Sequence, residues 1–243
     1  MGELMRHRFI LFIFFASFLA GLPSSAPQAQ VSAGELKLLH KLDSISASPS
    51  VSAYFSDLYF VTMVNAIRFF EKAHDSSRYV IRCMQTGFAG FFFAAADSFV
   101  QQKSIPDAWQ RYYADTTRTH LRHVLLGVNA HINGDIWQAL ARSFSYEELK
   151  KIRSLYFSYY HGLLDIYEDV YDAAYKINCS LRFAHAMSLG LDKWYGKKML
   201  HRWLRRQMKI ARLYYQSDKR FKKRLKKLGK RMRRIDEMII HHF

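Results

Sequence analysis

Apolar residues recur at helical spacing through almost all of the chain after Gly34, and this periodicity limits the fold more than any other feature of the sequence. Side chains three and four residues apart share a face of an α-helix, whereas a strand needs polar and apolar residues in alternation. The sequence contains no clean alternating run bounded by hairpin turns. It therefore predicts an all-α protein, a single-domain helical bundle with a long basic helix at its C-terminal end.

The segment from Tyr79 to Val100 is apolar on nearly every side and contains the small residues Gly87 and Gly90. A helix of this composition buries all of its faces, so we expect it at the centre of the bundle. Half of the residues in the chain are apolar, which is enough to bury a core that offsets the entropy of ordering. Other helices are expected at residues 35–44, 54–72, 116–142 and 145–178, the last of them starting from a capping box of Ser145 and Glu148.

Residues 1–30 have the pattern of a secretory signal peptide. Arg6 and Arg8 precede an apolar run of 14 residues that ends at Leu22, whereas a membrane-spanning helix needs about 20. We therefore expect this segment to be cleaved and the protein to be exported, either periplasmic or secreted. In an oxidising compartment Cys83 and Cys179 could form a disulfide, and the alternative is two buried thiols.

Positive charge is concentrated at the C-terminal end of the chain. The residues from Gly196 to Phe243 contain 18 Lys and Arg against 3 Asp and Glu, which accounts for +15 of the formal net charge of +17. Apolar residues follow one another there at alternating steps of four and three, an apolar seam on a basic helix, at Phe221, Leu225, Leu228, Met232, Ile235 and Ile239. The expected organisation is a signal peptide at 1–30, a linker and short helix at 31–50, a helical bundle domain at 51–205 and a basic amphipathic helical tail at 206–243.

A basic amphipathic helix of this kind suits an anionic membrane surface or another polyanion. Nucleic acid is the less favoured polyanion, because the protein is expected outside the cell. Two alternatives stay open, a basic face that is only solvated and a seam that pairs two copies as a coiled coil. The oligomeric state does not follow from the sequence.

The expected helix at 116–142 carries polar and small residues on one face. At about 100° per residue, that face holds His120, His123, Gly127, His131, Gly134, Asp135 and Gln138. His131 and Asp135 are one turn apart, a spacing that lets one helix present both to a metal ion, with zinc favoured. His161 and Asp165 repeat this spacing on the next expected helix.

The structural alternative for this polar strip is a set of hydrogen bonds in the bundle core. Asn129 and Asn133 would then bond neighbouring backbone groups, and the histidines would be satisfied by the protein itself. Gly127 and Gly134 remove side-chain bulk from the strip, so a second helix, a ligand or an ion could approach closely.

The stretch HVLLGVNAHINGDIWQAL resembles the hallmark helix of an uncharacterised bacterial helical family, a domain of unknown function with the pattern Gly-x-Asn-Ala-His-Ile-Asn-x-Asp. SDLYFVTMVNAIRFF, GFAGFFFAAADSFV and IPDAWQ are similar to other recurring blocks of that family, in the same order, so the resemblance covers about residues 55–203. It implies a helical fold and draws attention to Asn129, His131, Asn133 and Asp135, but it implies no activity.

HINGDIWQALA is also similar to a helix of the zinc-dependent phospholipase C and single-strand nuclease family, with matches at His131, Gly134, Asp135, Gln138 and Leu140. That likeness implies a metal cluster held by His131, Asp135, His161 and Asp165, whose bound hydroxide attacks a phosphodiester. Two functions therefore stay open. One is a metal-dependent hydrolase of phosphoesters, and the other is a non-enzymatic helical binding or structural protein at an anionic membrane surface.

Overall fold

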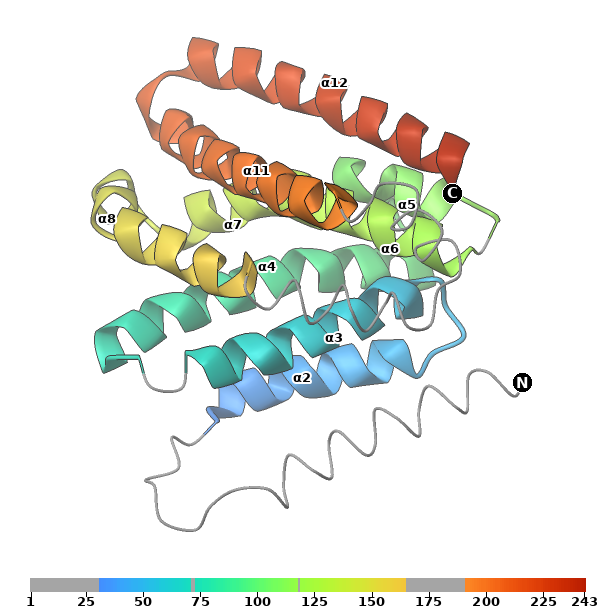
Figure 1. Cartoon of the computed structure of the whole chain (residues 1–243), viewed down its shortest axis with the longest axis horizontal. Coiled ribbons are helices and arrows are strands. Elements are labelled where there is room, and N and C mark those ends of the chain that lie inside the picture. The colour runs from blue at the N-terminus through green and yellow to red at the C-terminus, as the bar shows by residue number, and fades with distance from the viewer. Residues whose placement is uncertain (1–30, 71–72, 118, 165–190) are drawn as a thin grey trace. The chain divides into compact units, whose positions relative to one another are not determined.

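The computed structural model describes residues 31–70, 73–117, 119–164 and 191–243, and every regular element in these ranges is a helix. The all-α prediction is confirmed. The elements are α2 (Ala33–Ser46), α3 (Ser52–Phe69), α4 (Asp75–Val100), the 3-10 turn η1 (Asp107–Trp109), α5 (Gln110–Ala114), α6 (His120–Asn129), the π-helical segment η2 (Ala130–Asp135), α7 (Ile136–Ser143), α8 (Tyr146–Lys151), α11 (Leu191–Gln216) and α12 (Asp218–His242) (Figure 1). Residues 153–164 are helical as well.

The short N-terminal helix α2 belongs to the core. It begins at a capping box in which Ser32 Oγ accepts the Glu35 N–H at 3.2 Å, and a Glu35 carboxylate oxygen accepts the Ser32 N–H at 2.8 Å. Leu38 and Leu42 are buried where α2 packs on α3. The region expected as a linker is therefore part of one compact unit that runs from Val31 to Phe243.

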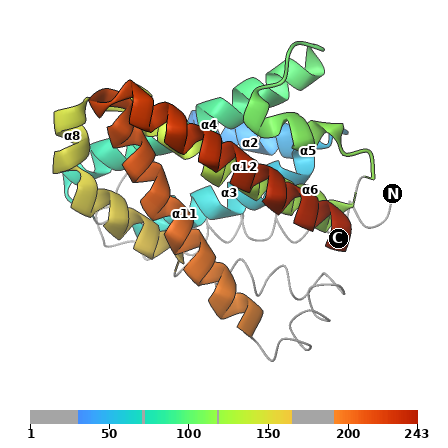
Figure 2. The ribbon, with the colours of Figure 1, turned by 90° about the horizontal axis from the view of Figure 1, so that it is seen from above.

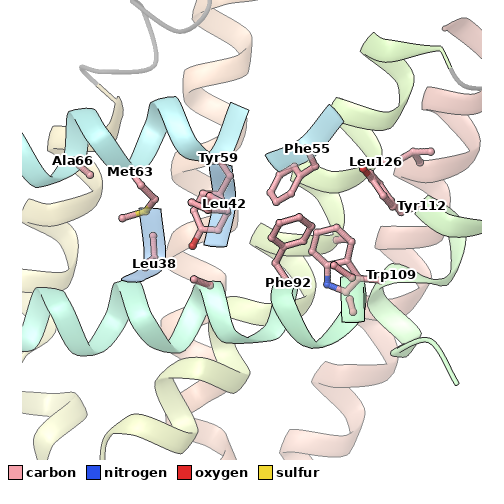
Figure 3. Close-up of a cluster of buried hydrophobic side chains, with 14 of the residues drawn as sticks. Leu38, Leu42, Phe55, Tyr59, Met63, Ala66, Phe92, Trp109, Tyr112 and Leu126 are labelled. Carbon is pink, nitrogen blue, oxygen red and sulfur yellow. The ribbon is translucent and has the colours of Figure 1, made fainter. Parts of the chain in front are cut away.

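The apolar helix α4 is central, as its composition predicts. It packs against α2, α7 and η2, and it supplies buried side chains to both apolar clusters of the bundle. In the first cluster Phe92 of α4 meets Phe55 and Trp109, with ring centroids 5.0 and 5.2 Å away (Figure 3). The second cluster is built around Met84, Leu140, Tyr156, Tyr160 and Met208.

The basic C-terminal helix is not a separate tail. The expected boundary between residues 205 and 206 lies inside α11, and α12 packs on α11, α6 and η2. Figure 2 shows α12 running from the end of α11 toward α6. Leu228 and Ile239 are buried, and Phe221 contacts Trp137 of α7 with ring centroids 5.3 Å apart. The apolar seam of α12 is thus an intramolecular packing surface, because it finds its partners on the bundle.

Three expectations fall wholly or partly outside the described residues. The signal peptide lies in residues 1–30, and Asp165 and Cys179 lie in residues 165–190. Cys83 is half-buried on α4, so its pairing with Cys179 stays a prediction. Within the described ranges, none of the helices combines the length and the apolar character needed to cross a membrane.

Candidate functional site

The family-like motif does not form one regular α-helix. The helix expected at 116–142 begins at His120, and residues 130–135 form the π-helical segment η2 before α7 resumes α-helical geometry. A π-helix bonds residue i to residue i+5, so its turns are wider than those of an α-helix. The rotation of about 100° per residue that defined the polar strip therefore does not hold across η2. Residues before and after η2 that were expected on one face of a helix do not share a face.

His131 and Asp135 lie together in the core. Asp135 Oδ2 accepts hydrogen bonds from His131 Nδ1 at 3.1 Å and from Trp109 Nε1 at 3.0 Å. The His131 ring packs against Tyr59 and Phe55, with centroids 4.6 and 5.5 Å away. The pair predicted from its spacing exists, but aromatic side chains enclose it.

The glycines of the motif are filled by other helices. A Cβ atom on Gly127 would lie 2.5 Å from the ring of Phe55, and one on Gly134 would lie 2.3 Å from the Cβ of Ala108. Contacts this short are sterically forbidden, so only glycine allows α3 and η1 to approach α6 and η2. The space that the two glycines leave is thus filled by neighbouring helical segments of the protein, and not by a ligand or an ion.

Burial governs the electrostatics of Asp135, whose side chain is almost inaccessible to solvent. Burial raises the pKa of Asp135, while the hydrogen bonds from His131 and Trp109 act in the opposite direction. A buried carboxyl group that accepts two N–H donors is a satisfied structural group.

A zinc site is a poor fit to these residues. Zinc centres in enzymes take three protein ligands, and Asp135 has only His131 beside it. The described residues contain no group of three or more His, Cys, Asp or Glu side chains that could hold a metal. His161 is exposed and pairs with His201 at a ring distance of 5.4 Å, and Asp165 lies outside the described residues. The zinc site stays a prediction.

The two asparagines of the motif form an amide ladder, which we define as Gln207, Asn133, Asn129 and Asp236. Gln207 Nε2 donates to Asn133 Oδ1 at 3.4 Å, and Asn133 Nδ2 donates to Asn129 Oδ1 at 2.9 Å. Asn129 Nδ2 donates to Asp236 Oδ1 at 2.7 Å and to the carbonyl oxygen of Met232 at 3.1 Å. The ladder therefore fastens α11 and α12 to the motif through buried hydrogen bonds.

Asp236 is the one acidic residue of α12 that faces inward. Burial raises its pKa to about 6, although the Asn129 hydrogen bond and the charge of Arg111 favour the ionised form. Burial thus shifts Asp236 toward its neutral form, because a lone carboxylate is costly to bury, but a group with a pKa of about 6 is still mostly ionised at pH 7.

The remaining residues of the strip are separate from the ladder. His120 is exposed beside the ring of Tyr54, and His123 is fully buried with its Nδ1 3.2 Å from the carbonyl oxygen of Thr119. Gln138 Nε2 donates to the carbonyl oxygen of Gly134 at 2.9 Å. The strip is therefore not a single site.

Trp109, Gln207 and Asp236 are partners that the sequence reasoning missed. They lie 26, 74 and 107 residues from the side chains that they bond. Of the three, only Asp236 could have been suspected from the sequence. It is an acidic residue in a basic segment, four residues after Met232 of the apolar seam.

The outer face of α12 has the opposite character. All eleven Lys and Arg residues of α12 are exposed, and the one ion pair found for them within the described ranges joins Lys222 to Asp218 at 2.7 Å. We call this surface the basic face. It consists of Lys219, Arg220, Lys222, Lys223, Arg224, Lys226, Lys227, Lys230, Arg231, Arg233 and Arg234.

Comparison with known proteins places this architecture in a family. Neither the curated proteins nor the solved structures contain a significant match to the chain. The family of unknown function DUF5995 matches residues 36–242, which include most of α2, the motif and nearly all of α12. The chain therefore belongs to this family of unknown function.

Proposed function

We propose that this protein is a non-enzymatic helical binding protein whose basic face docks on an anionic phospholipid surface. The observation that carries the proposal is the segregation of α12, whose cations are all exposed while its seam packs on the bundle. The basic face is therefore a fixed feature of a folded domain. The exported location expected from residues 1–30 belongs to the same proposal.

The dimensions of the basic face favour an extended partner. Twenty-five residues of α-helix span roughly 37 Å, and cations occur along most of that length. An anionic membrane presents charge over a comparable distance, whereas a small anion meets only a few of these side chains. Because the seam is buried in the bundle, attraction between charges supplies most of the binding, and salt weakens it.

The motif has a supporting role in this proposal. Asn129 holds α12 through Asp236 and Met232, and Gln207 extends the ladder to α11. Hydrogen bonds in a buried network fix the position of the helices that they join. The motif would then stabilise the folded bundle that carries the basic face and take no part in chemistry.

Vesicle binding tests the proposal. The full chain is expected to bind vesicles of phosphatidylglycerol and phosphatidylcholine at low salt, to leave them at high salt, and to ignore vesicles of phosphatidylcholine alone. Substitution of Lys223, Lys226 and Lys227 by Gln is expected to weaken binding about a hundredfold, at about 1 kcal/mol for each lysine near the surface.

The matched control substitutes Lys37, Lys103 and Lys151 by Gln. These lysines are exposed and lie on other elements, so the control removes the same charge from elsewhere. An equal loss in both variants would show that net charge alone drives binding. A full-length chain that ignores anionic vesicles at low salt, or binds only nucleic acid there, would refute the proposal.

A further inference from the structure

A basic cleft lies between helical residues 153–164, α11 and α12, and none of its lining residues belongs to the motif. Its volume is about 540 Å³, within the range of small-molecule sites. None of its lining residues is acidic, and six of them are cations, Arg153, Arg205, Arg206, Lys209, Arg212 and Arg224. The cleft is thus distinct from the basic face, with which it shares only Arg224.

Among the described residues, no acidic side chain neutralises the cations of the cleft. None of them forms an ion pair with an acidic residue in the described part of the chain. Arg206 Nη1 and Arg212 Nε are buried, and no hydrogen-bond acceptor meets either atom within the described ranges. Unsatisfied donors of this kind are costly in a folded protein, and an anion would satisfy them.

Aromatic rings hold two of the guanidinium groups in place. Arg153 lies over Phe157 and Arg212 lies over Tyr146, each with its Cζ 5.8 Å from the ring centroid. Such stacking leaves the edge of a guanidinium group available for hydrogen bonds. The cleft therefore presents partly positioned donors.

Positive charges crowd around Arg206 at the cleft. Burial lowers the pKa of Arg206, and the nearby charges of Arg231 and Arg224 lower it further. Partly buried charges are screened less by salt than exposed ones. A bound anion would relieve this repulsion more effectively than counter-ions do at the basic face.

We propose that this cleft binds a compact group that carries two or more phosphates. The planar fork of Arg matches phosphate oxygens in paired hydrogen bonds, and several phosphates concentrate enough negative charge in a small volume to meet six cations. A lipid headgroup and a soluble polyphosphate share this chemistry. The site stands apart from the proposed function, because a compact ligand in the cleft does not require a membrane.

Isothermal titration of the full chain with inorganic tripolyphosphate tests the proposal. Saturable binding at one site per chain is expected, and Arg206→Gln with Arg212→Gln is expected to weaken it at least tenfold. The matched control is Lys226→Gln with Lys227→Gln, which removes the same charge from the basic face and is expected to change the affinity less than threefold. Circular dichroism checks that each variant stays helical.

A second pair, Arg206→Lys with Arg212→Lys, keeps the charge and removes the guanidinium fork. It is expected to bind more weakly than the wild type, and it decides the matter if the Gln variant fails to fold. Absence of saturable binding, equal losses in the cleft and control variants, or full affinity in the Lys variant would each overturn the proposal.

Competition with vesicles distinguishes the two sources of phosphate. If tripolyphosphate releases vesicles from the wild type but not from the Arg206→Gln and Arg212→Gln variant, the cleft takes a lipid headgroup. If vesicle binding survives when the cleft is saturated, the ligand is a soluble polyphosphate. Either result retains the cleft as a phosphate site, and a failure of vesicle binding alone affects only the proposed membrane contact.

Discussion

Motif residues 129–135 and the basic face of α12 are both rich in polar residues, yet the first are buried and the second is exposed. Asn129, Asn133 and Asp135 are almost fully buried, and each has hydrogen-bond partners within the bundle. The cations of α12 point to solvent and have almost no partners in the described residues. A high density of polar residues alone therefore does not identify a binding surface. Polar groups that have hydrogen-bond partners inside the protein stabilise the fold, whereas exposed groups without such partners are available to bind another molecule.

The largest expected effect comes from breaking the amide ladder. Asn129→Ala leaves Asp236 buried without its donor and also removes the acceptor of Asn133. Each buried group left without its hydrogen-bond partner costs about 1 to 3 kcal/mol, and a charged group costs more. Because this change leaves two such groups, the free energy of unfolding should fall by about 3 to 5 kcal/mol in urea denaturation. The control Asn65→Ala removes an amide that donates to the carbonyl oxygen of Val61 within its own helix, and it should cost less than about 1 kcal/mol. Similar losses in both variants would contradict a special role for the ladder.

A smaller loss is expected from His131→Ala, which opens a space among aromatic rings and removes one donor to Asp135. The expected cost is about 2 to 4 kcal/mol, again in urea denaturation. Metal analysis of protein purified without chelator accompanies this measurement, and we expect no stoichiometric ion in the wild type. The opposite result would be a stoichiometric divalent ion in the wild type that is absent from His131→Ala and Asp135→Ala, with both variants still helical. That result would favour the metal-dependent hydrolase and contradict a purely structural role for these two residues.

Asp236→Asn is expected to stabilise the protein. The folded chain holds the Asp236 proton up to a pH of about 6, whereas an unfolded Asp holds it only up to about 4. Between these values the folded state binds more protons, so stability is greatest below pH 4 and falls as the pH rises through 6. Asn keeps the acceptor for Asn129 without the charge, and it should raise the free energy of unfolding at pH 7 by about 1 to 3 kcal/mol. Thermal unfolding at several pH values checks this, and an unchanged pH dependence in the variant would assign that dependence to other groups.

The smallest effect on stability is expected at the basic face. Lys223, Lys226 and Lys227 are exposed, so their replacement by Gln should change the free energy of unfolding by less than about 0.5 kcal/mol. Relief of repulsion among like charges makes a small gain the expected direction. A decrease of several kcal/mol in the free energy of unfolding would mean that these lysines stabilise the fold. They would then not differ from the buried polar residues of the motif.

Much of the fold follows from the sequence, because helical spacing and caps are local signals. The capping box of Ser145 and Glu148 starts α8 as expected, with the Glu148 N–H donating to Ser145 Oγ at 3.4 Å and a Glu148 oxygen accepting from the Ser145 backbone at 2.7 Å. The all-apolar composition of α4 also predicted its central position.

The site was harder to predict, because its geometry depends on partners far away in the chain. The π-helical turns of η2 changed which side chains share a face, and nothing in the spacing of the motif reveals such a segment. Asn129 was expected to bond neighbouring backbone groups, but its partners Met232 and Asp236 lie more than 100 residues away. The spacing of apolar residues in α12 does not tell whether they pack on the bundle or on another molecule. The structure shows that they pack on the bundle.

Measuring stability and vesicle binding on the same two variants tests the central claim most directly. The Lys223, Lys226 and Lys227 variant is expected to keep its free energy of unfolding and to lose about a hundredfold in affinity for anionic vesicles. Asn129→Ala is expected to lose about 3 to 5 kcal/mol of stability and, at a temperature where it stays folded, to retain affinity within about threefold. The opposite pattern, in which the folded Asn129→Ala variant loses vesicle binding and the lysine variant retains it, would contradict the division between a buried brace and an exposed contact face.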